Sequence, residues 1–105
     1  QIQIREAAIP AAREAVRLAS KDPANLDVLG QALFLASEQA EAITNFQSAL
    51  TLNPNYAPAL LHLGASFLER GQTEQAYQLI SQARMAAEGT PLADQASRLL
   101  ENFFP

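Results

Sequence analysis

The feature that most constrains the fold is an internal repeat of 34 residues. The segment 23–56 aligns with the segment 57–90 without a gap. Identical residues fall at unit positions 4, 7, 8, 20 and 27: Leu26 and Leu60, Leu29 and Leu63, Gly30 and Gly64, Ala42 and Ala76, Ala49 and Ala83. A fixed period of this length indicates a repeat protein, in which each unit buries its apolar face against its neighbours.

The apolar residues of each unit have helical spacing. Leu26, Leu29 and Leu33 follow one another at intervals of three and four residues, which places them on one stripe of a helix. Ala42 and Phe46 belong to a second stripe later in the same unit. Each unit is therefore expected to form two helices, and the chain to be all-α.

Polar residues, glycine and proline mark where these helices end. Asp22-Pro23 and Thr90-Pro91 each have the pattern of an N-cap followed by proline in the first turn. We expect further N-caps at Ser37, Asn55 and Thr73, and a left-handed helix terminus at Gly71.

Gly30 and Gly64 lie inside predicted helices, where glycine costs about 1 kcal/mol relative to alanine. Close helix packing accounts for them if the glycine at unit position 8 faces the alanine at position 20, which is Ala42 or Ala76. A leucine in place of either glycine is expected to force the helices apart.

Both flanks continue the pattern in shortened form. Residues 1–22 are expected to be the second helix of a truncated repeat, with Pro10 marking a helix that begins near Ile9. Residues 91–105 are expected to form a capping helix, with Asp94, Arg98 and Glu101 on its solvent side. These flanks and the two units make one domain, 1–105, of about six helices.

Further positions of the unit complete a known signature. Unit position 11 holds Leu33 and Phe67, position 24 holds Phe46 and Ile80, and position 32 of the first unit holds Pro54. With the identities above, this pattern resembles the tetratricopeptide repeat. The resemblance implies a right-handed superhelical stack of antiparallel helix pairs.

In that family the first helices of successive units line a concave groove that binds peptides or partner segments. The resemblance implies that the groove here is mostly apolar and has no basic residue, with Phe34, Leu61 and Leu68 as the strongest contacts. Its residues are Asp27, Gln31, Phe34, Leu35, Pro58, Leu61, His62, Ala65 and Leu68, together with Ala24, Val28 and Glu69 at the remaining groove positions. The alternative is that neighbouring helices cover most of these apolar side chains.

Some members of the family bind a terminal carboxylate through lysine, arginine and asparagine in the groove. The matching positions of this chain hold Asp27, Gln31, Leu61 and Ala65. We therefore expect no acidic chaperone-tail peptide to bind there.

Composition narrows the remaining possibilities. The net charge of −4 argues against nucleic-acid binding, and the absence of cysteine excludes disulfides and thiolate metal ligands. A metal site at His62 would need further ligands, and the sequence offers too few near it, so we expect no metal, no cofactor and no catalysis.

Arg13, Arg17 and Lys21 form a basic stripe that is expected to be solvated. No segment is apolar enough for membrane insertion, and nothing in the sequence indicates a compartment.

The sequence thus predicts a non-catalytic protein–protein interaction module that binds a peptide or helix of a partner in an apolar groove. The alternative is a structural spacer or self-association module of a larger protein. In that case a homo-oligomer is expected to form through the truncated first helix, near Ala8, Ala12 and Ala15.

Overall fold

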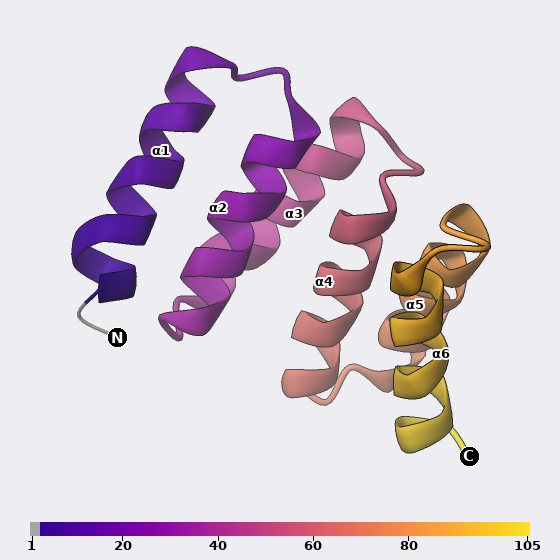
Figure 1. Ribbon diagram of the computed structural model, residues 1–105. Helices are drawn as coiled ribbons and strands as arrows, with labels where there is room; N and C mark the ends of the chain where they lie inside the picture. The colour runs from indigo at the N-terminus through magenta and orange to yellow at the C-terminus, as the bar shows by residue number, and fades with distance from the viewer. Residues whose placement is uncertain (1–2) are drawn as a thin grey trace. The chain divides into compact units, whose positions relative to one another are not determined.

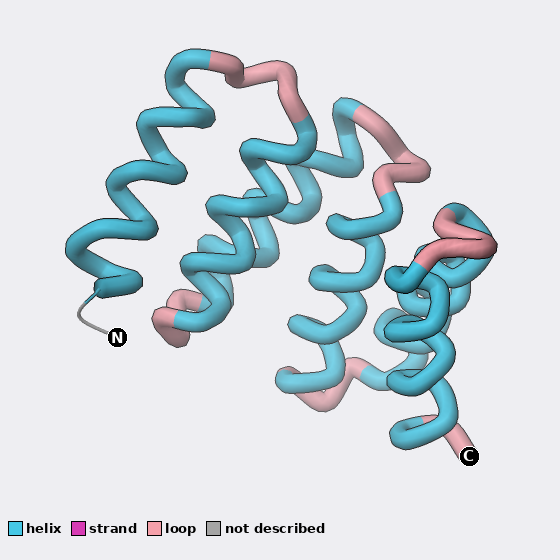
Figure 2. Tube along the Cα trace, in the orientation of Figure 1, coloured by secondary structure: helices cyan, strands magenta, loops and turns pink. Residues whose placement is uncertain are grey.

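The computed structural model describes residues 3–105, and within that range the chain is all-α (Figure 1). Six α-helices are joined by short loops, as Figure 2 shows, and a π-helical turn at Ile4–Ala8 precedes the first of them. The predicted all-α fold with six helices is confirmed. The chain divides into two compact units, Gln1–Pro54 and Asn55–Pro105.

The first unit contains helices α1 to α3, whose bounds are Ile9–Leu18, Pro23–Leu35 and Gln39–Leu52. Helix α2 packs against both α1 and α3. The second unit contains helices α4 to α6, whose bounds are Ala57–Glu69, Thr73–Ala86 and Pro91–Phe103. Here α5 packs against both α4 and α6.

Glycine allows the two helices of each hairpin to approach closely. A Cβ atom added to Gly30 on α2 would lie 2.4–2.9 Å from three ring atoms of Phe46 on α3. A Cβ atom added to Gly64 on α4 would lie 2.6 Å from Cγ1 of Ile80 on α5. The nearest neighbour of each glycine is thus the residue at unit position 24. The expected alanine at position 20 also lies against the glycine in the second hairpin, where the Ala76 carbonyl oxygen would be 3.4 Å from the added Cβ, but not among the three nearest atoms at Gly30.

Most of the predicted stripes form the cores of the units. Leu29, Leu33 and Phe46 are buried in the first unit, as are Leu63 and Ile80 in the second. Two phenylalanines lie outside these cores: Phe67, at the stripe position that matches Leu33, is only half-buried, and Phe103 near the chain end is 59% exposed. Both lie in the last turn of a helix, where fewer neighbouring residues cover the side chain.

The same hydrogen-bonded motif ends the first helix of each hairpin. Ser37 and Gly71 occupy the left-handed region, with φ values of 65° and 75°. Glu38 N–H donates to the Leu33 carbonyl at 2.8 Å, and Gln72 N–H donates to the Phe67 carbonyl at 2.9 Å. These are the bonds of a Schellman motif, which satisfies carbonyls that the helix end leaves unpaired.

The expectation for Gly71 is confirmed, whereas the predicted N-caps at Ser37 and Thr73 are wrong. Ser37 is the left-handed residue that ends α2, and the N-cap of α3 is the next residue, Glu38. Thr73 is already the first residue of α5. Because serine is favoured both at caps and at turns, its residue type alone does not separate the two positions.

The other predicted N-caps are confirmed at Asp22 and Thr90 and wrong at Asn55. Asp22 is the N-cap of α2, and its side chain accepts a hydrogen bond from Ala24 N–H at 2.9 Å. Thr90 is the N-cap residue of α6, but its hydroxyl donates to the Ala87 carbonyl instead. The N-cap of α4 is Tyr56, so the expectation of Asn55 is wrong.

The N-terminal flank is fixed to the first hairpin by an arginine. The Arg5 guanidinium donates to the Ala36 carbonyl at the end of α2, at 2.6 Å, and forms an ion pair with Glu38. Helix α1 begins at Ile9 as expected, and Pro10 lies where the π-helical turn Ile4–Ala8 passes directly into the α-helix.

The C-terminal helix α6 has the expected amphipathic character. Its residues Asp94, Arg98 and Glu101 are exposed, as predicted, whereas Leu100 is buried. Within residues 3–105, no helix has the length and apolar character needed to cross a bilayer.

Candidate partner-binding site

An exposed apolar pair lies on α2 in the first unit. Val28 and Leu35 are 53% and 60% exposed, and Phe34 beside them is half-buried. Because seven residues make about two turns of a helix, Val28 and Leu35 lie on the same side of α2. The buried face of α2 is formed by other residues, such as Leu29 and Leu33.

Asp27 and Gln31, two other predicted groove residues on α2, form a hydrogen-bonded pair. Gln31 Nε2 donates to Asp27 Oδ2 at 2.8 Å, and the Asp27 side chain is buried, with 2% of the residue exposed. A buried carboxylate is costly without such hydrogen bonds. This pair therefore has a structural explanation, and Asp27 offers little surface to a partner.

The predicted groove residues on α4 are mostly half-buried. Pro58, His62, Ala65 and Leu68 all have intermediate exposure. Leu61 differs, because it is 2% exposed and is one of the largest fully buried side chains of the chain. Leu61 therefore belongs to the interior, and in this conformation it cannot be a strong surface contact.

Two of the three cations of the predicted basic stripe lie on α1 and pair with carboxylates, whereas the exposed Lys21 follows that helix. Arg13 pairs with Glu41 of α3 at 2.7 Å, and Arg17 pairs with Glu14 at 2.6 Å. The hydrogen bond from Arg13 lowers the pKa of the Glu41 carboxyl, and the bond from Arg17 lowers the pKa of Glu14. The two arginines thus have partners within their own unit.

Metal binding has no support in the part of the chain that the structure describes. No group of three or more histidine, cysteine, aspartate or glutamate side chains there is arranged to hold a metal ion. His62, the only histidine, lies half-buried on α4.

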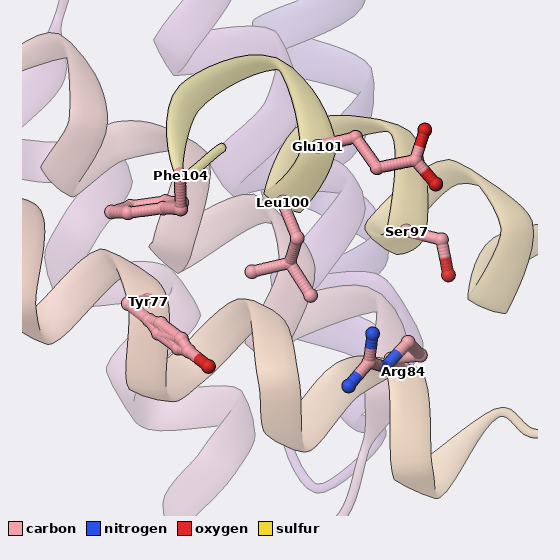
Figure 3. A pocket seen from close by; sticks show the side chains of 6 residues that line it. All are labelled: Tyr77, Arg84, Ser97, Leu100, Glu101 and Phe104. Atoms are coloured by element: carbon pink, nitrogen blue, oxygen red, sulfur yellow. The ribbon is translucent and has the colours of Figure 1, made fainter.

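A hollow between α5 and α6 was not predicted from the sequence. It has a volume of about 280 Å³ and is shown in Figure 3 with its lining residues: Tyr77, Arg84, Ser97, Leu100, Glu101 and Phe104. Tyr77 and Phe104 meet edge to face, with ring centroids 5.2 Å apart. The signal that could have found it is the second stripe of α5, Tyr77, Ser81 and Arg84, which lies beside the stripe that packs on α4.

A second hollow of about 450 Å³ adjoins the same helix pair, and it is lined by Arg84, Met85, Glu88, Gly89 and Ala93. Arg84 thus borders both hollows. Met85, a large apolar side chain, is 74% exposed.

Comparison with known proteins places the chain in a family. A sequence profile described as tetratricopeptide repeat matches residues 33–100. Among curated protein sequences, no match was found.

Solved structures give the same result for the fold. The yeast Sti1 TPR2B domain, solved as a complex with pHsp70, has a TM-score of 0.82 at 20% identity and covers 90% of this chain and 78% of that one. Two structures of MamA have TM-scores of 0.66 and 0.67 at 25% identity, and each covers 89% of this chain. The chain spans 63% and 58% of those two MamA chains. The family match, the repeated hairpins and the shared fold lead to one conclusion: this chain belongs to the tetratricopeptide repeat family.

Proposed function

We propose that the chain is a non-catalytic module that binds a polypeptide partner, and that the exposed apolar surface of α2 is a principal contact. Tetratricopeptide repeat domains generally mediate protein–protein interactions and are generally not catalytic. The related Sti1 domain was solved in a complex with pHsp70, so a fold of this kind is able to hold a polypeptide.

The observation that carries this proposal is the exposure of Val28 and Leu35. They are 53% and 60% exposed, at two positions that the tetratricopeptide resemblance assigns to partner contact. Exposed apolar side chains gathered on one face mark interaction surfaces more often than chance does. On α4, the half-buried Leu68 and His62 are the groove residues available for a separate contact, whereas Leu61 is not.

A partner suited to the α2 surface presents apolar side chains at matching intervals. Val28 and Leu35 are seven positions apart along α2. An amphipathic helix with apolar residues seven positions apart therefore presents side chains at the same spacing. We therefore expect selected ligands to carry two leucine, isoleucine or phenylalanine residues about two helical turns apart.

The test begins with selection of peptides from a random phage-displayed library against the intact chain. Their dissociation constants are then measured by calorimetry for the wild type, for Val28→Asp/Leu35→Asp, and for a matched control, Leu18→Asp. Leu18 is also a leucine of the first unit and is 71% exposed, but it lies at the end of α1.

The double variant is expected to bind at least about tenfold more weakly, because truncating a central apolar contact commonly costs more than 1 kcal/mol. The control should change affinity by less than about twofold, because surface substitutions away from a contact have small effects. The proposal is wrong if no peptide is enriched, or if the double variant and the control bind equally well. Light scattering that shows a dimer broken by the double variant would assign the surface to self-association instead.

A further inference from the structure

The two hollows along α5 and α6 share one cation, and we propose that together they form a second polypeptide-binding site, separate from the α2 surface. Its ligand is an extended acidic segment with an apolar side chain on either side of a carboxylate. This proposal concerns the second unit alone and does not depend on the function proposed for α2.

Arg84 is the charge that recognises the ligand. No ion pair joins it to a carboxylate among residues 3–105, in contrast to Arg5, Arg13 and Arg17 of the first unit. Figure 3 shows its guanidinium below Leu100 and apart from Tyr77, whereas the Glu101 carboxylate points away from that space. An arginine fork beside an open hollow is suited to a carboxylate, which it binds with two parallel hydrogen bonds.

The order of residues along the two antiparallel helices places one hollow on each side of Arg84. Tyr77 and Phe104 form an aromatic corner at one end, and Met85 and Ala93 line the hollow at the other. From Tyr77 to Ala86, the last residue of α5, the rise is about 13 Å, at about 1.5 Å per residue. An extended chain covers that distance in about four steps of about 3.3 Å, from its first residue to its fifth.

The positions of Arg84 and of the apolar residues on either side of it determine the spacing of side chains that the ligand needs. A carboxylate that binds Arg84 has one apolar neighbour directed toward the Tyr77–Phe104 corner and another toward Met85. Successive side chains of an extended segment alternate in direction, so the three contacting residues should occupy alternate positions. Each hollow also has one glutamate in its lining, Glu101 in the first and Glu88 in the second, and these carboxylates disfavour any acidic residue of the ligand other than the one that binds Arg84.

The proposal is tested with a synthetic peptide, acetylated and amidated, that carries leucine, glutamate and phenylalanine at alternate positions separated by alanine. A second peptide has glutamine in place of the glutamate. Binding to the full chain is measured by amide chemical-shift titration at low salt, for the wild type, Arg84→Gln and the control Arg98→Gln. Arg98 is an exposed arginine of α6 that lines neither hollow, so both variants remove one positive charge from the same unit.

We expect the acidic peptide to shift signals of α5 and α6, and Arg84→Gln to weaken its binding about tenfold, the loss of one charge-assisted pair. Arg98→Gln should change it by less than about twofold. The glutamine peptide should bind the wild type and Arg84→Gln with equal, weak affinity. The proposal is overturned if the acidic peptide fails to shift α5 and α6, if Arg84→Gln and Arg98→Gln weaken binding equally, or if acetate competes as effectively as the peptide. Val28→Asp/Leu35→Asp should leave this binding unchanged, which separates its outcome from that of the α2 test.

Discussion

The hairpin α2–α3 and the hairpin α4–α5 share one design, and three of the matched positions at which they differ bear directly on packing and helix ends. At the close contact, Gly30 faces the ring of Phe46, whereas Gly64 faces the side chain of Ile80. At the end of the first helix, Ser37 stands where the second hairpin has Gly71. The third difference is at unit position 19, where Glu41 forms an ion pair and Gln75 replaces it. The close contact and the left-handed helix end are kept in both hairpins although their residues differ, whereas the ion pair is found in the first hairpin only.

The largest expected effect is at the close contact. Gly30→Ala places a methyl group within 3 Å of three atoms of a buried ring, so we expect it to lower the free energy of unfolding by about 2 kcal/mol. Gly64→Ala meets only one atom closer than 3 Å, and should cost less than half as much. Urea unfolding followed by circular dichroism measures both changes. A larger loss for Gly64→Ala would contradict this comparison.

Exchanging the neighbour sharpens the same test. In the background Phe46→Ile, which copies the second hairpin, Gly30→Ala should cost less than it does in the wild type. The physical reason is that isoleucine lacks the ring edge that fills the space above Gly30. Equal costs in the two backgrounds would mean that the ring is not the obstacle.

The helix ends provide the next effect. Ser37→Gly should raise the free energy of unfolding by about 1 kcal/mol, because glycine adopts the left-handed region without steric cost. Gly71→Ala should lower the free energy of unfolding by a similar amount. The loss comes only from the left-handed backbone conformation, because a Cβ at position 71 would have no atom within 4 Å to clash with. Thermal unfolding of the two variants should therefore move in opposite directions. A shift in the same direction would show that the two ends are not equivalent.

Sequence reasoning was successful where the repeat itself carried the information. The 34-residue period gave the helices, because their apolar residues must recur on the buried face of each unit. It misplaced Ser37 and Thr73, since cap and turn positions favour the same residue types. The ion pair between Arg13 and Glu41 could not be predicted, because the two residues are 28 positions apart and only the packing of α1 and α3 in the folded unit brings them together.

The candidate sites were harder to predict than the fold. Leu61 and Leu35 look alike in sequence, yet one is 2% and the other 60% exposed, because burial depends on which helix covers each face. The hollow between α5 and α6 combines Tyr77, Arg84 and Phe104, which lie outside the repeated stripes. A stripe identifies the core of a unit, but it does not show which of the other faces remain open.

A buried hydroxyl predicts a gain in stability in the second hairpin. Ser81 Oγ is buried and has no hydrogen-bond partner among residues 3–105, whereas the matched residue of the first hairpin, Gln47, is exposed. Ser81→Ala removes this unsatisfied group and favours the helix, so we expect a gain of about 1 kcal/mol in urea unfolding. A loss of stability would mean that the hydroxyl has a partner in solution.

The ion pair of the first hairpin gives the smallest effect, and it depends on pH. Arg13 holds the pKa of the Glu41 carboxyl below its ordinary value of 4.5, so the pair contributes stability above that value and loses it as the pH falls through the lowered pKa. Glu41→Gln should therefore cost about 0.5 kcal/mol at neutral pH, since both side chains are partly exposed, and nothing in strong acid. The control is Glu74→Gln, an exposed glutamate of α5 outside the ion pairs of the described residues. A cost that persists unchanged in acid would contradict this assignment.

Photo-crosslinking shows whether the α2 surface holds a polypeptide partner. A benzoylphenylalanine is placed at position 35 of α2 or, as the control, at position 52 of α3, where Leu52 is also an exposed leucine of the first unit. Each protein is irradiated with a peptide obtained from the library selection, and the products are identified by mass spectrometry. We expect a crosslinked peptide from position 35 and none from position 52. Crosslinking from position 52 alone, or equally from both positions, would mean that the partner does not bind at the α2 surface.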